Sequence, residues 1–335
     1  MTGSLDHLDG LSSVILSGPV GIGKTAIALT LLHHDRTKTR FGGNRHFMRC
    51  DNLENSLRFF LEGLCDAVGL PLVGNSEALR LRIAPLHPFL LVLDGVERVL
   101  DPLAAESEEI ATTMEEISQL ENVCLLATSR MAIDIPRFQI TEVPTLPGDK
   151  ACDVFYALCP LSRSSAIDDL VARLDFHPLS IAFLAGAVCE KSWDEPRLLR
   201  EWDDSQTDAL KVDGNQSLAA VMESALASPT IRKLGPPAQE ALEALAAYPD
   251  GVNETRVGRM FPAIAGVEEV VDTLCRFYLV ERHDGFVRLL SPFRFHFLQQ
   301  AFTIVHTKEE GGSTDRPVVG EGGHVPCYTA RAGSS

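Results

Sequence analysis

The sequence predicts an α/β domain with a five-stranded parallel sheet, followed by an all-α helical domain and a winged-helix domain. Three observations support this fold class. Over 1–146, short apolar runs alternate with amphipathic helical stretches, a pattern typical of parallel sheets covered by helices. Over 147–205 the pattern is helical throughout. Over 206–305 short helices precede two β-rich runs, whereas the tail over 306–335 lacks periodicity and is expected to be disordered.

Five short apolar runs are the expected strands of the sheet. The run "FLLVLD" is apolar without interruption, as a strand buried on both faces must be. Helices are expected between the strands, the first of them directly after a glycine-rich loop. The expected strands are Val14–Leu16, Arg45–Cys50, Phe89–Asp94, Val123–Arg130 and Phe138–Val143.

Proline and glycine mark the boundaries in the rest of the chain. Pro178 divides the stretch 165–190 into two helices, since proline ends a helix or starts the next one. Asp284 and Gly285 stand between two β-rich runs, and this pair is a strong signal for a hairpin turn. Short helices followed by such a hairpin predict the winged-helix shape.

The composition is that of an ordinary globular protein, with 45% hydrophobic residues among 335. The net charge of -16 disfavours a protein built around nucleic acid, because phosphate contacts need Lys and Arg surfaces. The eight cysteines form no CxxC pair, which favours reduced thiols over a zinc site. Without a signal-peptide pattern or an apolar run of about 20 residues, the chain is expected to be cytoplasmic and not to engage membranes.

The segment "GPVGIGKT" fits the phosphate-binding pattern G-x-x-x-x-G-K-[ST]. Its glycines let backbone N–H groups turn toward a β-phosphate, and the following helix points its positive end at the same group. Lys24 is expected to reach the β- and γ-phosphate oxygens, and the Thr25 hydroxyl to bind Mg²⁺. The residues expected to bind the nucleotide are Gly18, Pro19, Val20, Gly21, Ile22, Gly23, Lys24, Thr25 and Ala26.

A carboxylate stands at the end of the apolar strand. Asp94 ends "FLLVLD", where ligands bind in open α/β sheets, and is expected to hold Mg²⁺ through water. Many P-loop ATPases carry a second acid directly afterwards to activate water, but this chain has Gly95. Glu97 is a candidate catalytic substitute, with a solvated loop acid as the favoured alternative. Slow hydrolysis is therefore expected.

Arg130 ends the strand "CLLATSR" and is a candidate for contact with a γ-phosphate, with an arginine in a surface ion pair as the alternative. The chain has no N-K-x-D stretch, which disfavours a GTPase. It also has no LSGGQ-like stretch, which disfavours a transporter ATPase.

The order of these motifs resembles that of STAND NTPases, most closely the NB-ARC-like chains common in fungi. The resemblance covers about 14–302, including a part similar to the winged-helix domain of those proteins. The stretches that carry it are "GPVGIGKTAIALTLLHH", "RFGGNRHFMRCD", "FLLVLDGVERV", "CLLATSR", "VPTLPGDKACDVF", "LDFHPLSIAFLAGA" and, downstream, "KLGPPAQEALEALAAYPDGV" and "YLVERHDGFVRLLSPFRFHF".

The resemblance implies a sheet of the AAA+ type and an adenine nucleotide, ATP or ADP, between the domains. It implies that Pro178 packs near the adenine, although from the residues alone Pro178 is equally a helix breaker. Arg130 matches the family's sensor arginine. Such proteins exchange ADP for ATP, open and self-associate to recruit protein partners. In fungi they are linked to non-self recognition and programmed cell death.

The chain also departs from the family pattern. Few residues precede Gly18, where the family has a segment that lines the adenine pocket. The upstream effector domain and downstream repeats of the family have no counterpart, so a truncated receptor is expected. Leu289-Leu290-Ser291 stands where the family has Met-His-Asp, so tight locking of ADP is not expected.

Three functions follow from these features. The first is an ATP/ADP-binding signalling switch with slow hydrolysis, a form of fungal NOD-like receptor. The second is a non-catalytic nucleotide-binding interaction module, favoured by the missing acid at Gly95. The third is a winged-helix DNA-binding regulator, which is disfavoured because Arg256, Arg259 and Arg276 are diluted by neighbouring acids.

Overall fold

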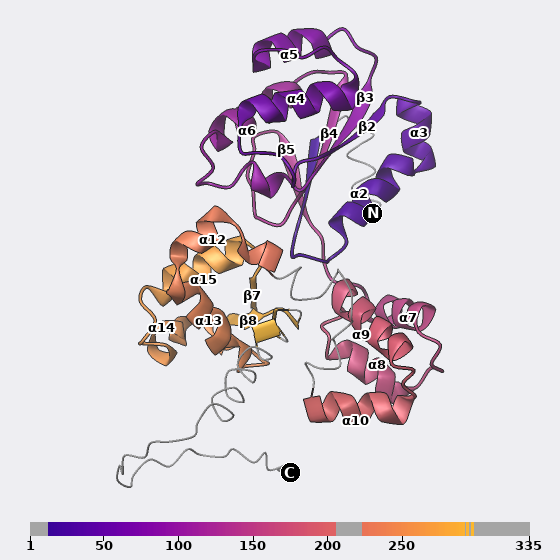
Figure 1. The fold of residues 1–335 in the computed structure, drawn as a ribbon, viewed down its shortest axis with the longest axis vertical. Helices are drawn as coiled ribbons and strands as arrows, with labels where there is room; N and C mark the ends of the chain where they lie inside the picture. Colours follow the sequence, from indigo (N-terminus) through magenta and orange to yellow (C-terminus); the bar gives the residue numbers. More distant parts are fainter. Residues whose placement is uncertain (1–12, 206–222, 292, 295, 298–335) are drawn as a thin grey trace, which may run out of the picture.

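A computed structural model describes residues 13–205, 223–291, 293, 294, 296 and 297. It shows an α/β unit, a helical unit and a third region of short helices with a small sheet (Figure 1). The first residues of the chain, residues 206–222 and the tail that is expected to be disordered lie outside the described residues.

The α/β unit is built on a parallel sheet with the strand order β2-β3-β4-β1-β5. All residues of β1, β3 and β4 are buried, because these three strands occupy the middle of the sheet and are covered on both faces. The five strands are β1 (Ser13–Ser17), β2 (Arg45–Arg49), β3 (Phe89–Asp94), β4 (Val123–Ser129) and β5 (Phe138–Glu142). The predicted five-stranded sheet is thus confirmed, with shifts of one residue at some strand ends.

Helices cover both faces of this sheet. One face packs against α2 (Lys24–His33) and α3 (Asp35–Phe41) through a core that includes Val14 and Leu31. The other face packs against α4 (Leu57–Val68), α5 (Ser76–Ile83) and α6 (Ser107–Ser118) through a second core. A short 3₁₀ helix, η1 (Val96–Arg98), follows β3. The helix α4 ends at Gly69, which takes the left-handed conformation (φ 77°) that glycine adopts without steric cost.

The helical unit has a core of its own. It contains α7 (Gly148–Leu158), α8 (Ser165–Ala172), α9 (Pro178–Glu190) and α10 (Glu195–Ser205). The core joins Phe155, Leu184 and Trp202, and it is separate from the two cores of the α/β unit. Pro178 is the first residue of α9, where its missing N–H leaves no helical hydrogen bond unmade.

The third region combines short helices with a small antiparallel sheet of order β6-β8-β7. The expected hairpin forms at Asp284 and Gly285, whose φ angles of 50° and 79° suit a two-residue turn. The elements are α12 (Pro229–Leu234), α13 (Pro236–Ala246), β6 (Val252–Asn253), η3 (Glu254–Arg256), α14 (Val257–Met260), α15 (Val267–Arg276), β7 (Val280–His283) and β8 (Phe286–Leu289). Its classification as a winged helix, and the domain boundaries, stay predictions.

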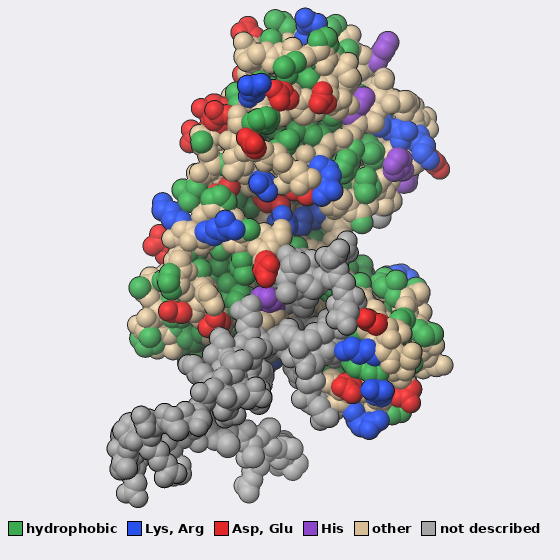
Figure 2. All heavy atoms as spheres, in the orientation of Figure 1, with side chains coloured by type: hydrophobic (Ala, Val, Ile, Leu, Met, Phe, Trp, Pro, Cys, Tyr) green, Lys and Arg blue, Asp and Glu red, His purple; other side chains and the backbone are tan. Residues whose placement is uncertain are grey.

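The third region shares a continuous apolar core with the α4–α6 face of the α/β unit. Polar contacts reinforce this junction: the Tyr278 hydroxyl contacts Ser17 Oγ at 3.1 Å, and the Ala132 amide donates to the Arg276 carbonyl at 2.8 Å. On the face shown in Figure 2, Lys and Arg side chains gather along the same junction. The two parts therefore pack as one body. Within the described residues, no helix is long and apolar enough to cross a bilayer.

The buried Asp101 carboxylate accepts hydrogen bonds across this junction. Its side chain is 1% exposed, and it accepts hydrogen bonds from Ser228 Oγ at 2.5 Å and Thr230 Oγ1 at 2.6 Å. Ser228 is also the N-cap of α12, so its hydrogen bond to Asp101 fixes the start of that helix against the α/β unit.

We expect Asp101→Asn to lower the free energy of unfolding by about 2 kcal/mol, since hydrogen bonds to a charged acceptor are lost in a buried place. Urea titration followed by circular dichroism measures the change. The control is Asp66→Asn, which removes an exposed carboxylate at the end of α4 and is expected to change stability by less than about 0.5 kcal/mol. Equal effects of the two substitutions would contradict a stabilising role for the Asp101 hydrogen bonds.

Candidate functional site

The glycine-rich loop lies between the central strand β1 and the helix α2. Gly18, Gly21 and Gly23 all have positive φ angles (144°, 75° and 103°), which turn the backbone around a concave space. Gly23 is the N-cap residue of α2 and no side chain caps this helix end. The free N–H groups of the first turn therefore remain available to an anion.

Lys24 folds back across this loop. Its Nζ donates hydrogen bonds to the carbonyls of Gly18 at 2.8 Å and Pro19 at 2.7 Å, and its side chain is buried. Burial lowers the pKa of Lys24 to about 8, against the opposing attraction of the Glu97 carboxylate. A buried ammonium beside a ring of backbone N–H groups is suited to a multiply charged anion.

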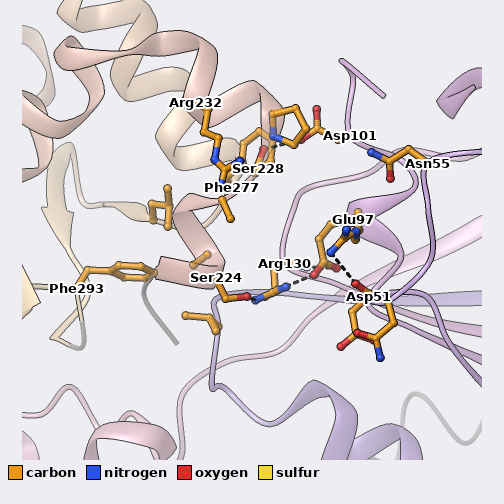
Figure 3. Close-up of a pocket in the computed structure, with 17 residues that line it drawn as sticks. Asp51, Asn55, Glu97, Asp101, Arg130, Ser224, Ser228, Arg232, Phe277 and Phe293 are labelled. Carbon is orange, nitrogen blue, oxygen red and sulfur yellow. Dashed lines mark hydrogen bonds and ion pairs between the residues drawn. The ribbon is translucent and has the colours of Figure 1, made fainter. Parts of the chain in front are cut away.

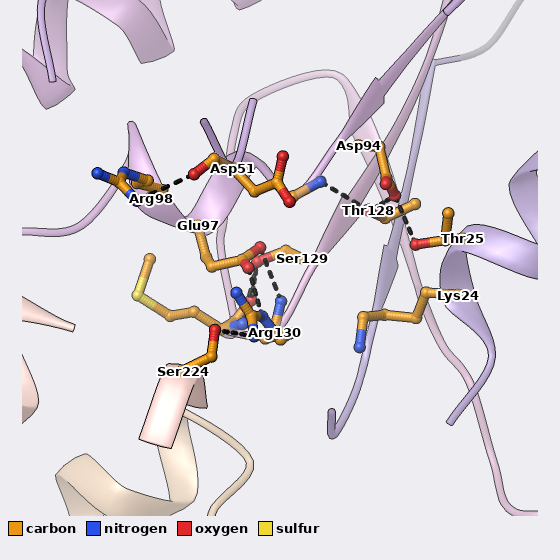
Figure 4. A network of polar contacts seen from close by, with 12 residues as sticks. Lys24, Thr25, Asp51, Asp94, Glu97, Arg98, Thr128, Ser129, Arg130 and Ser224 are labelled. Atoms are coloured by element: carbon orange, nitrogen blue, oxygen red, sulfur yellow. Dashed lines mark hydrogen bonds and ion pairs between the residues drawn. The ribbon is translucent and has the colours of Figure 1, made fainter. Parts of the chain in front are cut away.

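Asp94 joins three segments at the carboxyl edge of the sheet. Its Oδ1 accepts hydrogen bonds from Thr25 Oγ1 and from Thr128 Oγ1, both at 2.7 Å. Thr128 Oγ1 in turn accepts from the Gly95 amide at 2.9 Å (Figure 4). The predicted metal-binding pair, Thr25 and Asp94, is thus brought into direct contact.

Glu97 and Arg130 form an ion pair beside this group. Arg130 Nε lies 2.6 Å from Glu97 Oε1, and the Arg130 amide donates to the other carboxylate oxygen at 3.2 Å. The Glu97 side chain is only 11% exposed, so the interpretation of Glu97 as a solvated loop acid is wrong. It is held because η1 turns back toward the end of β4. Arg130 also contacts Ser224 Oγ of the third region at 3.3 Å.

The start of α9 lies on the glycine-rich loop. An added Cβ at Gly21 would be 2.5 Å from Leu179 Cδ2 and 2.6 Å from its Cβ. His177 is fully buried, and the backbone of Val20 in the loop lies close to its ring. Burial lowers the pKa of His177 to about 4, so the ring is neutral at physiological pH. Pro178 therefore lies next to two residues packed at the loop, and its role toward a nucleotide stays a prediction.

Two cavities adjoin this group of residues. A cavity of 360 Å³ lies over the loop and is lined by Lys24, Thr25, Asp94, Glu97 and Arg130 among others. The predicted catalytic and metal-binding residues thus share one cavity. A second cavity, of 460 Å³, lies between the α/β unit and the third region and shares Glu97 and Arg130 with the first (Figure 3).

Sequence reasoning missed three residues of these cavities. Asp51 follows β2 and lines both of them. Ser224 and Asp101 belong to the contacts between the α/β unit and the third region. Asp51 stands directly after a predicted strand, which is a signal that the sequence offers. Asp101 lies in a loop with no recognisable pattern, and Ser224 lies in a short helical stretch whose contact with Arg130 depends on the fold.

A central parallel sheet, a glycine-rich loop before a helix, and a Thr–Asp pair at its edge define the fold of a P-loop NTPase. Comparison with solved structures agrees. The chain is similar to a Walker-type ATPase of Pyrococcus abyssi, with a TM-score of 0.59, 13% identity, and coverage of 88% of this chain and 93% of that one. At this identity the likeness shows the fold.

Two further solved structures are matched with lower TM-scores. One is a STAND protein with a tetratricopeptide repeat sensor from Pyrococcus horikoshii, with a TM-score of 0.38, 12% identity and coverage of 90% of this chain. The chain spans 42% of that protein's length. The other is a mutant RuvB of Thermotoga maritima, with a TM-score of 0.42, 14% identity, and coverage of 88% and 87%. Neither protein-family models nor curated protein sequences match this chain.

The lowered pKa of Lys24 predicts that ATP binding takes up a proton at high pH. At pH 7 the amine is already charged, whereas at pH 9 it is largely neutral until phosphate restores its charge. We therefore expect proton uptake near zero at pH 7 and approaching one at pH 9, with affinity falling as pH rises above about 8. Calorimetry in two buffers of different ionisation heat measures the uptake. Lys24→Arg stays charged at both pH values and should show none; equal uptake in the parent chain and this variant would contradict the assignment.

Contact between the loop and α9 is tested at Gly21. Gly21→Ala is expected to destabilise the protein by about 1–3 kcal/mol more than Gly23→Ala. Both positions have positive φ, but only Gly21 faces an atom within 4 Å, so the second variant controls for backbone strain. Thermal unfolding of the two variants measures the difference. The contact is refuted if the two glycine variants unfold alike.

Proposed function

We propose that this protein is a switch of the STAND class that binds ATP and ADP and hydrolyses ATP slowly. The observation that carries the proposal is the position of Arg130. It lines the cavity over the glycine-rich loop, forms an ion pair with Glu97 and contacts Ser224 of the third region. One side chain thus joins the place expected for a γ-phosphate to a part of the chain outside the α/β unit.

Competition for Arg130 supplies a way to tell ATP from ADP. A γ-phosphate in the cavity offers a bidentate partner stronger than one neutral hydroxyl. Moving the guanidinium toward phosphate weakens its contacts with Glu97 and Ser224. A switch needs a differential affinity of only a few kcal/mol between its two states, and charge-assisted hydrogen bonds are of that size.

Slow hydrolysis follows from the arrangement of the acids. Gly95 offers no side chain at the position of the second acid, and Glu97 is engaged by Arg130 through two contacts. A carboxylate that is both paired with an arginine and largely shielded from solvent, with only 11% of its side chain exposed, is a weak base toward water. We therefore expect turnover on the order of one per minute or slower, against the usual enzymatic range of roughly 1–1,000 per second.

Magnesium fits the residues present. Thr25 Oγ1 and Asp94 Oδ1 are oxygen donors in direct contact, and Mg²⁺ prefers oxygen ligands with several waters retained. When bound, the ion supplies charge neutralisation for the β- and γ-phosphates. Thr128 holds the Asp94 carboxylate in place for this role.

Self-association with protein partners and the fungal receptor type rest on the order of motifs and belong to the same proposal. The DNA-binding alternative gains no support from the described residues. Arg282 pairs with Glu254 at 2.7 Å and with Asp272, so charges are neutralised around α15. The carboxyl end of α15 also docks on the α/β unit through the Arg276 carbonyl.

Nucleotide-binding measurements test the proposal. We expect Lys24→Ala to weaken the binding of both ATP and ADP by at least about tenfold, and Arg130→Ala to weaken ATP about tenfold with ADP changed less than about twofold. Denaturing the purified protein and identifying released nucleotide by chromatography should give adenine nucleotide. Fluorescence titration with labelled ATP and ADP gives the dissociation constants.

The matched control is Arg58→Ala, which removes an exposed arginine on α4 that pairs with Glu62. Its nucleotide affinities should equal those of the parent chain. If Lys24→Ala binds nucleotide as well as the parent, the switch proposal fails. If Arg130→Ala loses ATP and ADP equally, Arg130 does not distinguish them and the non-catalytic binding module becomes the better description.

A further inference from the structure

Gly95 faces Asp51, which follows shortly after the neighbouring strand β2. Gly95 has a φ of 77°, and a Cβ added there would lie 3.2 Å from the Cβ of Asp51 and 3.6 Å from its amide nitrogen. The Asp51 side chain thus begins next to the place where a side chain on residue 95 would begin. No other residue lies among the nearest atoms to that position.

The register of β2 and β3 explains why Asp51 lies beside Gly95. The strands β2 and β3 are parallel neighbours, with Arg49 opposite Asp94. The Cys50 amide donates to the Asp94 carbonyl at 2.8 Å, so the chains stay side by side for one further residue. Asp51 and Gly95 then leave the same edge of the sheet together. In Figure 4, Asp51 lies between Arg98 and the Asp94–Thr128 pair.

Polar contacts fix the position of Asp51 but leave its side chain partly exposed to solvent. Its carbonyl accepts a hydrogen bond from Arg98 Nη1 at 3.0 Å, which fixes the backbone after β2. Its carboxylate accepts from Arg49 Nε at 3.1 Å and Nη2 at 2.6 Å. Each carboxylate oxygen retains a second lone pair. The side chain is 31% exposed and lines the cavity that also contains Lys24 and Asp94.

Glu97 is less suited to the same task. Each of the two acids is held by one arginine through both of its oxygens, but the Glu97 side chain is only 11% exposed, against 31% for Asp51. Asp51 is engaged by one exposed arginine, whose side chain is 60% exposed and screened by solvent. The carboxylate with the greater freedom to accept from a water molecule is therefore Asp51.

We propose that Asp51 is the catalytic carboxylate that orients the attacking water, in place of the acid missing at residue 95. This inference rests on the proposed ATP hydrolysis. The water oxygen forms a bond to the γ-phosphorus, the bond from that phosphorus to the β–γ bridging oxygen breaks, and ADP leaves with its electron pair. Asp51 accepts the proton of the water and passes it to solvent, so ATP and water give ADP, phosphate and a proton.

The test compares Asp51→Asn with Arg49→Gln. The first keeps the shape of the side chain and removes its charge, whereas the second breaks the same ion pair but leaves the carboxylate. We expect Asp51→Asn to slow hydrolysis about 100-fold and Arg49→Gln to change it less than about threefold. Single-turnover hydrolysis of ATP labelled at the γ-phosphate measures the rate. Labelled-ATP titration should give dissociation constants within about twofold of the parent for both variants.

Each result has one meaning. If the two variants slow hydrolysis equally, Asp51 serves only in the ion pair and the inference fails. If Asp51→Asn hydrolyses at the parent rate while Glu97→Gln does not, the carboxylate is Glu97 and the inference also fails. A parent chain that binds ATP but releases no phosphate within a day overturns Asp51 as a catalyst and leaves the binding switch intact. A parent chain that binds no nucleotide overturns the proposed function itself.

Discussion

One carboxylate oxygen, Oδ1 of Asp94, holds the site together. It accepts from Thr25 at the start of α2 and from Thr128 near the end of β4, both at 2.7 Å. These hydrogen bonds set the glycine-rich loop against the edge of the sheet, and through Thr128 they also fix the Gly95 amide. The strand β3 is fully buried, so the position of Asp94 is set by the packing of the sheet. The glycine-rich loop, the Thr25–Asp94 pair and the loop after β3 all take their places from these two hydrogen bonds.

A second layer of interactions connects this group to the rest of the chain. Arg130 extends from the end of β4 to Glu97 and to Ser224, while Leu179 packs against Gly21. The helical unit therefore contacts the glycine-rich loop, and the third region contacts Arg130 beside it. Such an arrangement lets a ligand at one site change the contacts of two other parts of the molecule.

Much of the fold followed from the sequence, because its signals are local. The buried strand "FLLVLD", the loop around Lys24 and the turn at Asp284 each depend on residues close together in the chain. Glu97 was misjudged because its burial depends on Arg130, thirty-three residues away. Asp51 was missed because its importance depends on strand register and on the empty position at Gly95. Contacts of this kind arise only when strands are placed side by side.

The separate core of the helical unit has a mechanical consequence. The α/β unit and the third region share continuous apolar packing, whereas among the described residues Leu179 is the side chain that packs against both that core and the core of the helical unit. The other ties are polar, such as Ser291 with Ser180 at 3.3 Å and Arg288 with Asp175 at 3.5 Å. Water replaces polar ties far more readily than it replaces apolar packing. Among the described residues, the contacts between the helical unit and the rest are therefore the ones that water can most readily replace, whereas the α/β unit and the third region are joined by apolar packing.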